Sequence, residues 1–167
     1  LAEAASQFDA YDYAVLGAGL EESSHGDHEN TASIISSSSA SFFGYVDLGV
    51  STYNYTTAQI EAKIDAWKAM GADGIFLDDF GYDYGVTRAR QNAAVSYAHG
   101  RGLPVVANAW DPDDVFGPAA DAIANPDGAA PVIDGRDFYL SESFQIQSGS
   151  YQTESAWYAK AAKLEAY

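Results

Sequence analysis

Short apolar runs recur along the chain at intervals of about 30 residues. They are rich in Val, Ile, Phe and Tyr and are bounded by turn-forming residues, which is typical of buried β-strands. The five runs are YDYAVLG (11–17), SFFGYVDLG (41–49), ADGIFLDD (72–79), LPVVANAW (103–110) and DFYLSES (137–143). The pattern therefore predicts five strands, each in its own structural unit.

Helical patterns lie between the predicted strands. In segment 56–71 apolar residues recur at i, i+4 and i+7, which indicates a helix with one buried face. Thr56 and Gln59 have the spacing of a capping box, and Gly71 is placed to end this helix. The other predicted helices are 28–39, which is weak because of its serine run, 87–102, which Thr87 can cap, and 154–167.

Alternating strands and helices at this spacing predict βαβ units around a parallel sheet. An open doubly wound sheet of five strands fits the pattern, and so does a (β/α)8 TIM barrel, which typically takes about 250 residues. Five units in 167 residues leave such a barrel incomplete, with the remaining units in a continuation of the chain or in another protomer. Because the loop NPDGAAPVIDG (125–135) connects units and divides no domains, residues 1–167 are expected to form one α/β, TIM-barrel-like domain.

The predicted strands end in polar residues. Asp47 closes the second strand, Asp78 and Asp79 close the third, Asn108 lies at the end of the fourth, and Glu142 closes the fifth. In parallel α/β folds these carboxyl ends form the face where ligands bind. A single acid there is commonly a helix cap. Polar ends on four strands instead favour a shared functional site.

Two carboxylates on different strands of one face indicate glycoside hydrolysis. This reaction needs one acid to protonate the leaving oxygen and a second carboxylate as nucleophile or base. Asp78 and Glu142 are the candidate pair. Because side chains alternate along a strand, Asp78 and Asp79 are expected to point to opposite sides, so that Asp79 caps the next segment or supports a neighbour.

Aromatic residues near the strand ends suggest a sugar site, because pyranose rings stack their apolar faces on aromatic rings. Ordinary packing explains at least part of this enrichment. The predicted substrate-binding residues are Asp47, Asp79, Tyr45, Tyr82, Asn108 and Trp110.

The segment GADGIFLDDFGYD resembles the strand motif of the endo-alpha-1,4-polygalactosaminidase family, glycoside hydrolase family 114. The sequence SESF, with Glu142, is similar to a later strand end of that family, and GYVDLG is similar to another. The resemblance covers about residues 40–143. It implies a (β/α)8 barrel, Asp78 and Glu142 as catalytic carboxylates, and galactosamine-containing polysaccharides as substrates. The chain departs from the family at Asp79, where the family commonly has Asn.

The charge is strongly negative, with 24 acidic residues against 8 basic ones. Nucleic acid is therefore not expected as a partner, because phosphate binding requires a basic face, and an anionic membrane surface is disfavoured likewise. The acidic surface is explained by solubility or by adaptation to high salt, and it would suit a cationic amino-sugar polymer. The localisation expected is extracellular or at a cell or virion surface.

Other sequence features argue against a membrane span, a disulfide, a metal site and a cofactor. No apolar run approaches the roughly 18 residues of a membrane span, and no signal-peptide pattern is visible at LAEAASQF. The chain has no Cys, so disulfides and thiolate metal sites are excluded. GAGLEE lacks the third glycine of a dinucleotide loop, and neither HGDHEN nor WDPDDVFG matches a strong metal signature. No metal and no cofactor are therefore expected.

A second function hypothesis uses the same scaffold without catalysis. The domain would then be a glycan-binding or structural part of a larger surface assembly, such as a virion tail fibre or an archaeal surface structure. An incomplete barrel and the strongly acidic charge favour this alternative, since fold alone does not fix function.

Overall fold

The computed structural model describes residues 1–167 and confirms the five predicted strands. They are β1 (Tyr13–Leu16), β2 (Ser41–Asp47), β3 (Gly74–Asp78), β4 (Val105–Ala109) and β5 (Phe138–Ser141). All neighbouring strands pair in parallel, in the order β1-β2-β3-β4-β5. Because the spatial order follows the chain order without reversal, the sheet has barrel topology and not the doubly wound alternative.

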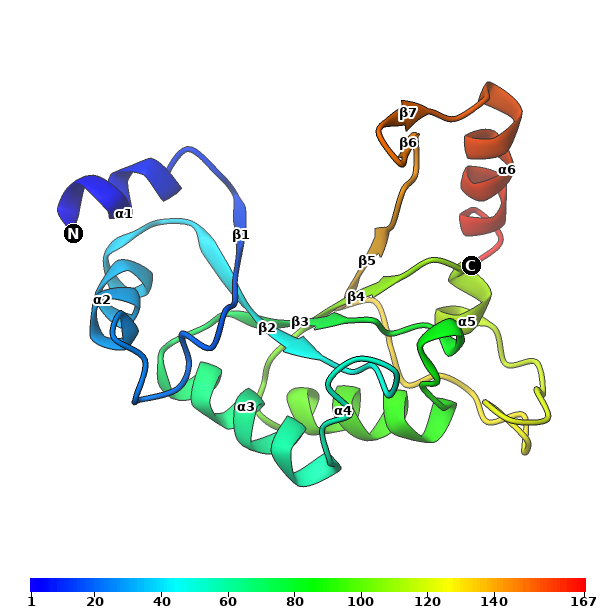
Figure 1. Cartoon of the computed structure of the whole chain (residues 1–167), viewed down its shortest axis with the longest axis horizontal. Coiled ribbons are helices and arrows are strands. Elements are labelled where there is room, and N and C mark those ends of the chain that lie inside the picture. The colour runs from blue at the N-terminus through cyan, green and yellow to red at the C-terminus, as the bar shows by residue number, and fades with distance from the viewer.

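The helices cover one face of the curved sheet. Helices α3 (Thr57–Ala69) and α4 (Arg88–Gly100) lie against its convex side, whereas the concave side carries no helix (Figure 1). Five parallel βα units thus form a half-barrel. The other elements are α1 (Ala2–Phe8), α2 (His28–Ser37), the 3-10 turn η1 (Tyr82–Tyr84), α5 (Pro112–Phe116), β6 (Ile146–Gln147), β7 (Ser150–Tyr151) and α6 (Glu154–Leu164). None of the helices combines the length and apolar character that a bilayer crossing requires.

Three predicted helix boundaries are explained by local chemistry. Thr56 caps α3, with its hydroxyl accepting from the Gln59 N–H while the Gln59 side chain accepts from the Thr56 N–H. Gly71 follows the helix with φ of 92°, a backbone conformation that only glycine adopts without strain. Thr87 caps α4 through the Arg90 N–H. These signals are local, so the sequence alone was enough to find them.

The hydrophobic core lies between the convex face of the sheet and these two helices. The fully buried Trp67 of α3 rests on β2 at Gly44, and its indole N–H donates to the Tyr45 carbonyl at 3.0 Å. A Cβ on Gly44 would lie 2.1 Å from the indole ring, so only glycine permits this close approach. The other core strand residues are Phe42, Val46, Ile75, Leu77, Val105, Ala107 and Ala109.

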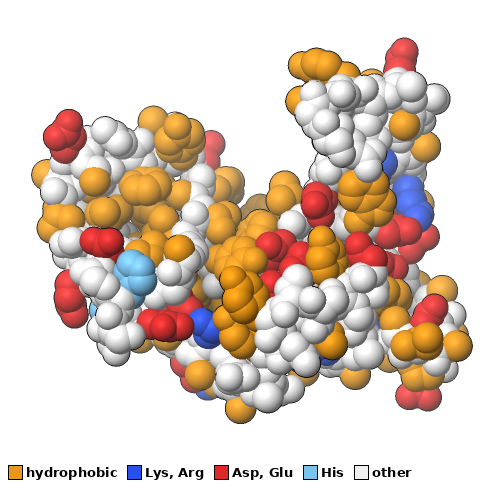
Figure 2. Space-filling view, viewed as in Figure 1, with side chains coloured by type: hydrophobic (Ala, Val, Ile, Leu, Met, Phe, Trp, Pro, Cys, Tyr) orange, Lys and Arg blue, Asp and Glu red, His pale blue; other side chains and the backbone are white.

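The concave face is also apolar over much of its area, and hydrophobic side chains gather in the hollow of the molecule (Figure 2). The ring centroids of Tyr13 in β1 and Phe138 in β5 lie 5.6 Å apart, and Phe43 of β2 contacts both rings. The first and last strands therefore face each other across the barrel interior. Tyr13 and Phe138 nonetheless remain 60% and 43% exposed, because no further strand covers them.

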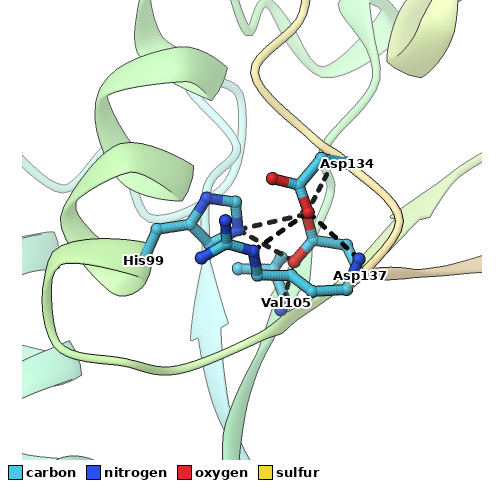
Figure 3. A network of polar contacts seen from close by, with 5 residues as sticks. His99, Val105, Asp134 and Asp137 are labelled. Carbon is cyan, nitrogen blue, oxygen red and sulfur yellow. Dashed lines mark hydrogen bonds and ion pairs between the residues drawn. The ribbon is translucent and has the colours of Figure 1, made fainter.

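The opposite end of the barrel is tied together by Asp137, which precedes β5 (Figure 3). Its carboxylate lies 2.9 Å and 3.1 Å from Nε2 of His99, at the end of α4. It also accepts from the backbone N–H groups of Val105 and Asp134. One almost fully buried carboxylate thus joins a helix, a strand and a loop, which gives His99 a structural role.

We expect Asp137→Ala to lower the free energy of unfolding by about 2–3 kcal/mol, because buried donors lose their acceptor. Asp134→Ala is the matched control: its side chain is 46% exposed, so its loss should cost at most about 1 kcal/mol. Urea denaturation of both variants measures the difference. Equal effects of the two substitutions would contradict the role assigned to Asp137.

Candidate active site

The register of the sheet brings polar residues of three strands to one edge. Asp47 of β2 pairs directly with Asp78 of β3, and Asn108 lies near the end of β4. These side chains alternate with the buried core residues, so they point to the concave side. The predicted gathering of Asp47, Asp78 and Asn108 at the carboxyl ends of the strands is therefore present in the structure.

Asp78 is held between its two neighbouring strands. The hydroxyl of Tyr45 donates to Oδ2 at 2.8 Å, and Nδ2 of Asn108 donates to Oδ1 at 2.7 Å. Each carboxylate oxygen thus has one neutral donor, and no cation neutralises the group. This arrangement fixes the orientation of Asp78 while leaving lone pairs on both oxygens for a ligand.

Tyr45 is suited to remain a donor in this contact. Burial and the neighbouring carboxylate of Asp78 raise the pKa of its hydroxyl far above the usual value. Its ring stacks on Phe76 with centroids 6.0 Å apart and planes 18° apart. This ring pair forms an apolar floor beneath Asp78 on the concave face of the sheet.

Asp79 departs from the alternation expected of a strand. The strand ends at Asp78, and Asp79 has φ of 50°, a left-handed conformation that Asp tolerates better than most residues. Its side chain therefore does not face away from the site but lies with Asp47 and Thr52. Both acids of the motif thus lie at the carboxyl ends of the strands, an edge of the half-barrel that we call the mouth. This differs from the expectation that Asp78 and Asp79 point to opposite sides.

Asp47 and Asp79 form a close acid pair. Burial, a hydrogen bond with Asp47 and the charges of Asp78 and Asp47 raise the pKa of Asp79 to about 6. The buried Asp47 also accepts from the Thr52 hydroxyl at 2.7 Å. A Cβ on Gly49 would lie 2.3 Å from that hydroxyl and 3.0 Å from Cβ of Asp79, so a glycine is needed for this packing.

Glu142 lies on the other side of the mouth, just after β5. The charges of Asp79 and Glu142, together with burial, raise the pKa of the Tyr84 hydroxyl in η1. Tyr84 is therefore within electrostatic reach of acids that follow β3 and β5. Lys160 of α6 donates to the Glu142 carbonyl, and burial lowers the pKa of its ammonium against the opposing charges of Glu142 and Asp111.

The two remaining predicted residues lie apart from Asp78. Tyr82 places its ring 5.7 Å from the guanidinium carbon of the buried Arg88, and its own hydroxyl is buried without a partner. Trp110 is 40% exposed and carries the Lys160 ammonium 4.6 Å above its ring. It lines a pocket of about 270 Å³ between β4 and α6. Tyr82 therefore packs within the protein against Arg88, and Trp110 lies at the edge of the site beside α6.

The other candidate ligand residues have local partners. His25 accepts from the Asp27 N–H, and His28 lies 3.0 Å from the Leu20 carbonyl. Asp111 caps α5 by accepting from the Asp113 N–H, and its carboxylate pairs with Lys163 at 2.6 Å. The structure has no cluster of three or more acidic, His or Cys side chains arranged to hold a metal ion.

Several residues of the mouth carry no sequence signal. Thr52 lies in the loop after β2, and Lys160 lies in α6, a helix that packs near the site only through tertiary structure. Glu21 is visible in the sequence only as part of a glycine-containing loop. Its proximity to Lys63 of α3, at 2.6 Å, depends on a contact across 42 positions.

Comparisons with known proteins give the fold. Neither a protein-family model nor a curated protein sequence matches the chain. Pyruvate carboxylase from Rhizobium etli with the allosteric activator acetyl coenzyme-A is 11% identical, with a TM-score of 0.53 over 93% of this chain and 15% of that chain. The carboxyl transferase domain of that enzyme is 13% identical, with a TM-score of 0.53 over 93% of this chain and 26% of that chain.

The same domain with 3-bromopyruvate is 13% identical, with a TM-score of 0.51 over 96% of this chain and 27% of that chain. This chain therefore spans only a small part of the proteins that it matches. The fold is part of a TIM barrel. Identities this low carry no information on activity, so the chemistry of the site rests on its own residues.

The acid pair predicts a pH-dependent stability. Because the folded-state pKa of Asp79 is raised from 3.8 to about 6, its contribution to stability is present below about pH 4 and is lost as the pH rises through about 6. In Asp79→Asn this loss should be smaller by about 1 kcal/mol, because solvent screens a partly exposed carboxyl. Urea denaturation at pH 4, 5, 6 and 7 measures the change.

Asp47→Asn tests the same pair from its other member, because it removes a cause of the raised pKa of Asp79. Both variants should therefore show a weaker decline of stability between pH 4 and pH 7. If both follow the wild-type curve in parallel, Asp79 does not hold its proton in the way described.

Proposed function

We propose that the chain is a glycoside hydrolase-like domain that acts on an extracellular or cell-surface amino-sugar polysaccharide with two carboxylates. The observation that carries the proposal is the position of Asp78. Tyr45 and Asn108 orient its carboxylate from both sides, and a second acid with a raised pKa follows it directly. A fixed carboxylate together with an acid that holds its proton up to about pH 6 resembles the combination that glycoside hydrolysis requires.

Asp78 is the proposed nucleophile or base. It has no cationic partner that would compete for its lone pairs, and an apolar ring pair lies beneath it. The resemblance of GADGIFLDDFGYD to the polygalactosaminidase family supports the same assignment and names galactosamine-containing polymers as the substrate class. The negative charge of the chain, −16, would attract such a cationic polymer.

Glu142 is the proposed general acid, with Asp79 as the alternative. The resemblance favours Glu142, and its charge acts on Tyr84 from across the mouth. The raised pKa of Asp79 favours Asp79 for the same role. The two assignments differ in geometry, because one acid follows β5 and the other follows Asp78 itself.

The second candidate function is a non-catalytic glycan-binding or structural domain of a surface assembly. The specific observation in its favour is the open barrel: the concave face leaves apolar side chains exposed, and neither of the pockets at the mouth is lined by Asp78 or Glu142. Such a domain would work at a cell or virion surface, in a high-salt environment, as one subunit among others.

Asp78→Asn should lower kcat on galactosamine or glucosamine oligomers by at least about a thousandfold, because the reacting carboxylate is lost. Release of reducing ends measures turnover. Asp12→Asn is the control, since this exposed acid precedes β1 at the opposite end of the barrel. Equal turnover of Asp78→Asn and the wild type would remove Asp78 from the reaction.

The dependence of turnover on the leaving group distinguishes Glu142 from Asp79 as the general acid. A variant that lacks the acid should lose about 10²–10⁴-fold on natural glycans but retain turnover of aryl glycosides whose leaving groups need no proton. Glu142→Gln is expected to show this selective loss. If Asp79→Asn shows it instead, Asp79 is the acid, and absence of all turnover in the wild type would favour the non-catalytic candidate.

A further inference from the structure

A second pocket of about 240 Å³ lies beside the carboxylates at the mouth of the half-barrel. It is formed by the loops after β1 and β2, by the end of β2 and by Lys63 of α3. Tyr45 and Asp47 line it, and the hydroxyl of Tyr45 also donates to Asp78. The pocket therefore lies next to the proposed reaction site and shares Tyr45 with it. Its volume suits a group smaller than a drug-sized ligand.

A buried carboxylate with a free oxygen lines this pocket. The side chain of Glu21 is 3% exposed, and its Oε1 pairs with the Lys63 ammonium at 2.6 Å. Its Oε2 is buried and accepts no hydrogen bond from the chain. An unpaired buried carboxylate oxygen is unfavourable, so an occupant of the pocket that supplies a donor would be stabilised there.

The charge around the pocket selects against anions. Lys63 is the one cation that lines it, and it is already shared by Glu21 and Glu22. Burial opposes its charge, but the hydrogen bonds that its ammonium donates to both carboxylates outweigh this effect and raise the pKa of Lys63. Asp47 adds a further acid. A bound carboxylate or sulfate would therefore meet several like charges and no free cation.

An aromatic wall completes the pocket. Tyr53 and Tyr55 stack with ring centroids 5.3 Å apart and planes 6° apart, and both rings line the cavity. Tyr53 is 67% exposed although it is ordered against its neighbour. A flat, exposed aromatic surface is the shape that packs against the C–H face of a pyranose ring.

We infer that this pocket is a saccharide subsite that accepts a neutral or amino sugar unit and rejects uronic or sulfated sugars. The inference rests on the proposed function for its link to hydrolysis. A hydroxyl or ammonium group of the sugar donates to Oε2 of Glu21, and the ring packs on Tyr53. The sugar bound here belongs to the same chain as the unit attacked at Asp78.

Calorimetric titration of the whole chain with three oligosaccharides tests the inference. Galactose and galactosamine oligomers should bind, and oligogalacturonate, which has the same ring stereochemistry, should bind at least about tenfold more weakly. Equal affinity for the uronate would overturn the charge selection.

Tyr53→Ala is the decisive variant, because its exposed side chain can be removed without disturbing the core. It should weaken binding of the neutral and amino oligomers by at least about tenfold. Tyr151→Ala, which removes an exposed tyrosine of β7, is the matched control and should leave affinity unchanged. A change of less than twofold in Tyr53→Ala would overturn the subsite.

Glu21→Gln examines the carboxylate directly. It should reduce the preference for the galactosamine oligomer over the oligogalacturonate, with circular dichroism confirming that the variant is folded. An unchanged preference in the folded variant would limit Glu21 to an ion pair and overturn its role. If the wild type binds the oligomers without hydrolysing them, and Tyr53→Ala weakens this binding, only the proposed function is refuted. If the wild type hydrolyses the oligomers and Tyr53→Ala has an unchanged KM, only the subsite is refuted.

Discussion

The parallel register of β2, β3 and β4 is the constraint on which the candidate site depends. It sets Asp47 opposite Asp78 and places Nδ2 of Asn108 2.7 Å from Oδ1 of Asp78. Parallel pairing fixes this arrangement because a shift of one residue would turn every side chain to the other face and bury the acids against the helices. The core residues that alternate with these polar groups therefore hold the site in place through their own burial.

The electrostatics of the mouth follow from the close approach of several acidic side chains. Several acids converge with no basic residue among the hydrogen-bond donors of Asp78, so neutral donors hold its carboxylate, and the pKa of Asp79 is raised to about 6. Such an arrangement lowers stability at neutral pH, where Asp79 is largely ionised, and leaves a proton on Asp79 only below about pH 6. The raised pKa is thus a consequence of packing acids at one edge of a sheet.

The open side of the half-barrel leaves apolar side chains exposed to solvent. Tyr13 and Phe138 meet across the interior, yet both remain partly exposed. The similarity to part of the carboxyl transferase domain of pyruvate carboxylase agrees with a fragment of a barrel and gives no chemistry, because the identity is 13%. The same concave face therefore carries a cluster of acids at one end and an uncovered apolar surface beneath it.

Much of the fold was predictable from the sequence because its signals are local. The five strands, the α3 capping box and the glycine that ends α3 each depend on residues close together in the chain. The short helices α1 and α5 and the β6–β7 hairpin were not predicted, because elements of two to seven residues carry too little periodicity. The gathering of Asp47, Asp78 and Asn108 was also predicted, since parallel strands place their carboxyl ends together.

The sequence by itself thus determined the βα units, the acidic charge and the edge at which polar residues gather. Only the tertiary structure decided that Asp79 turns toward Asp47, that Tyr82 packs on Arg88, and that Glu21 meets Lys63. These outcomes depend on a left-handed backbone conformation and on contacts between distant segments. No periodic pattern encodes such contacts, because they arise only when packing of the whole sheet and its helices brings the segments together.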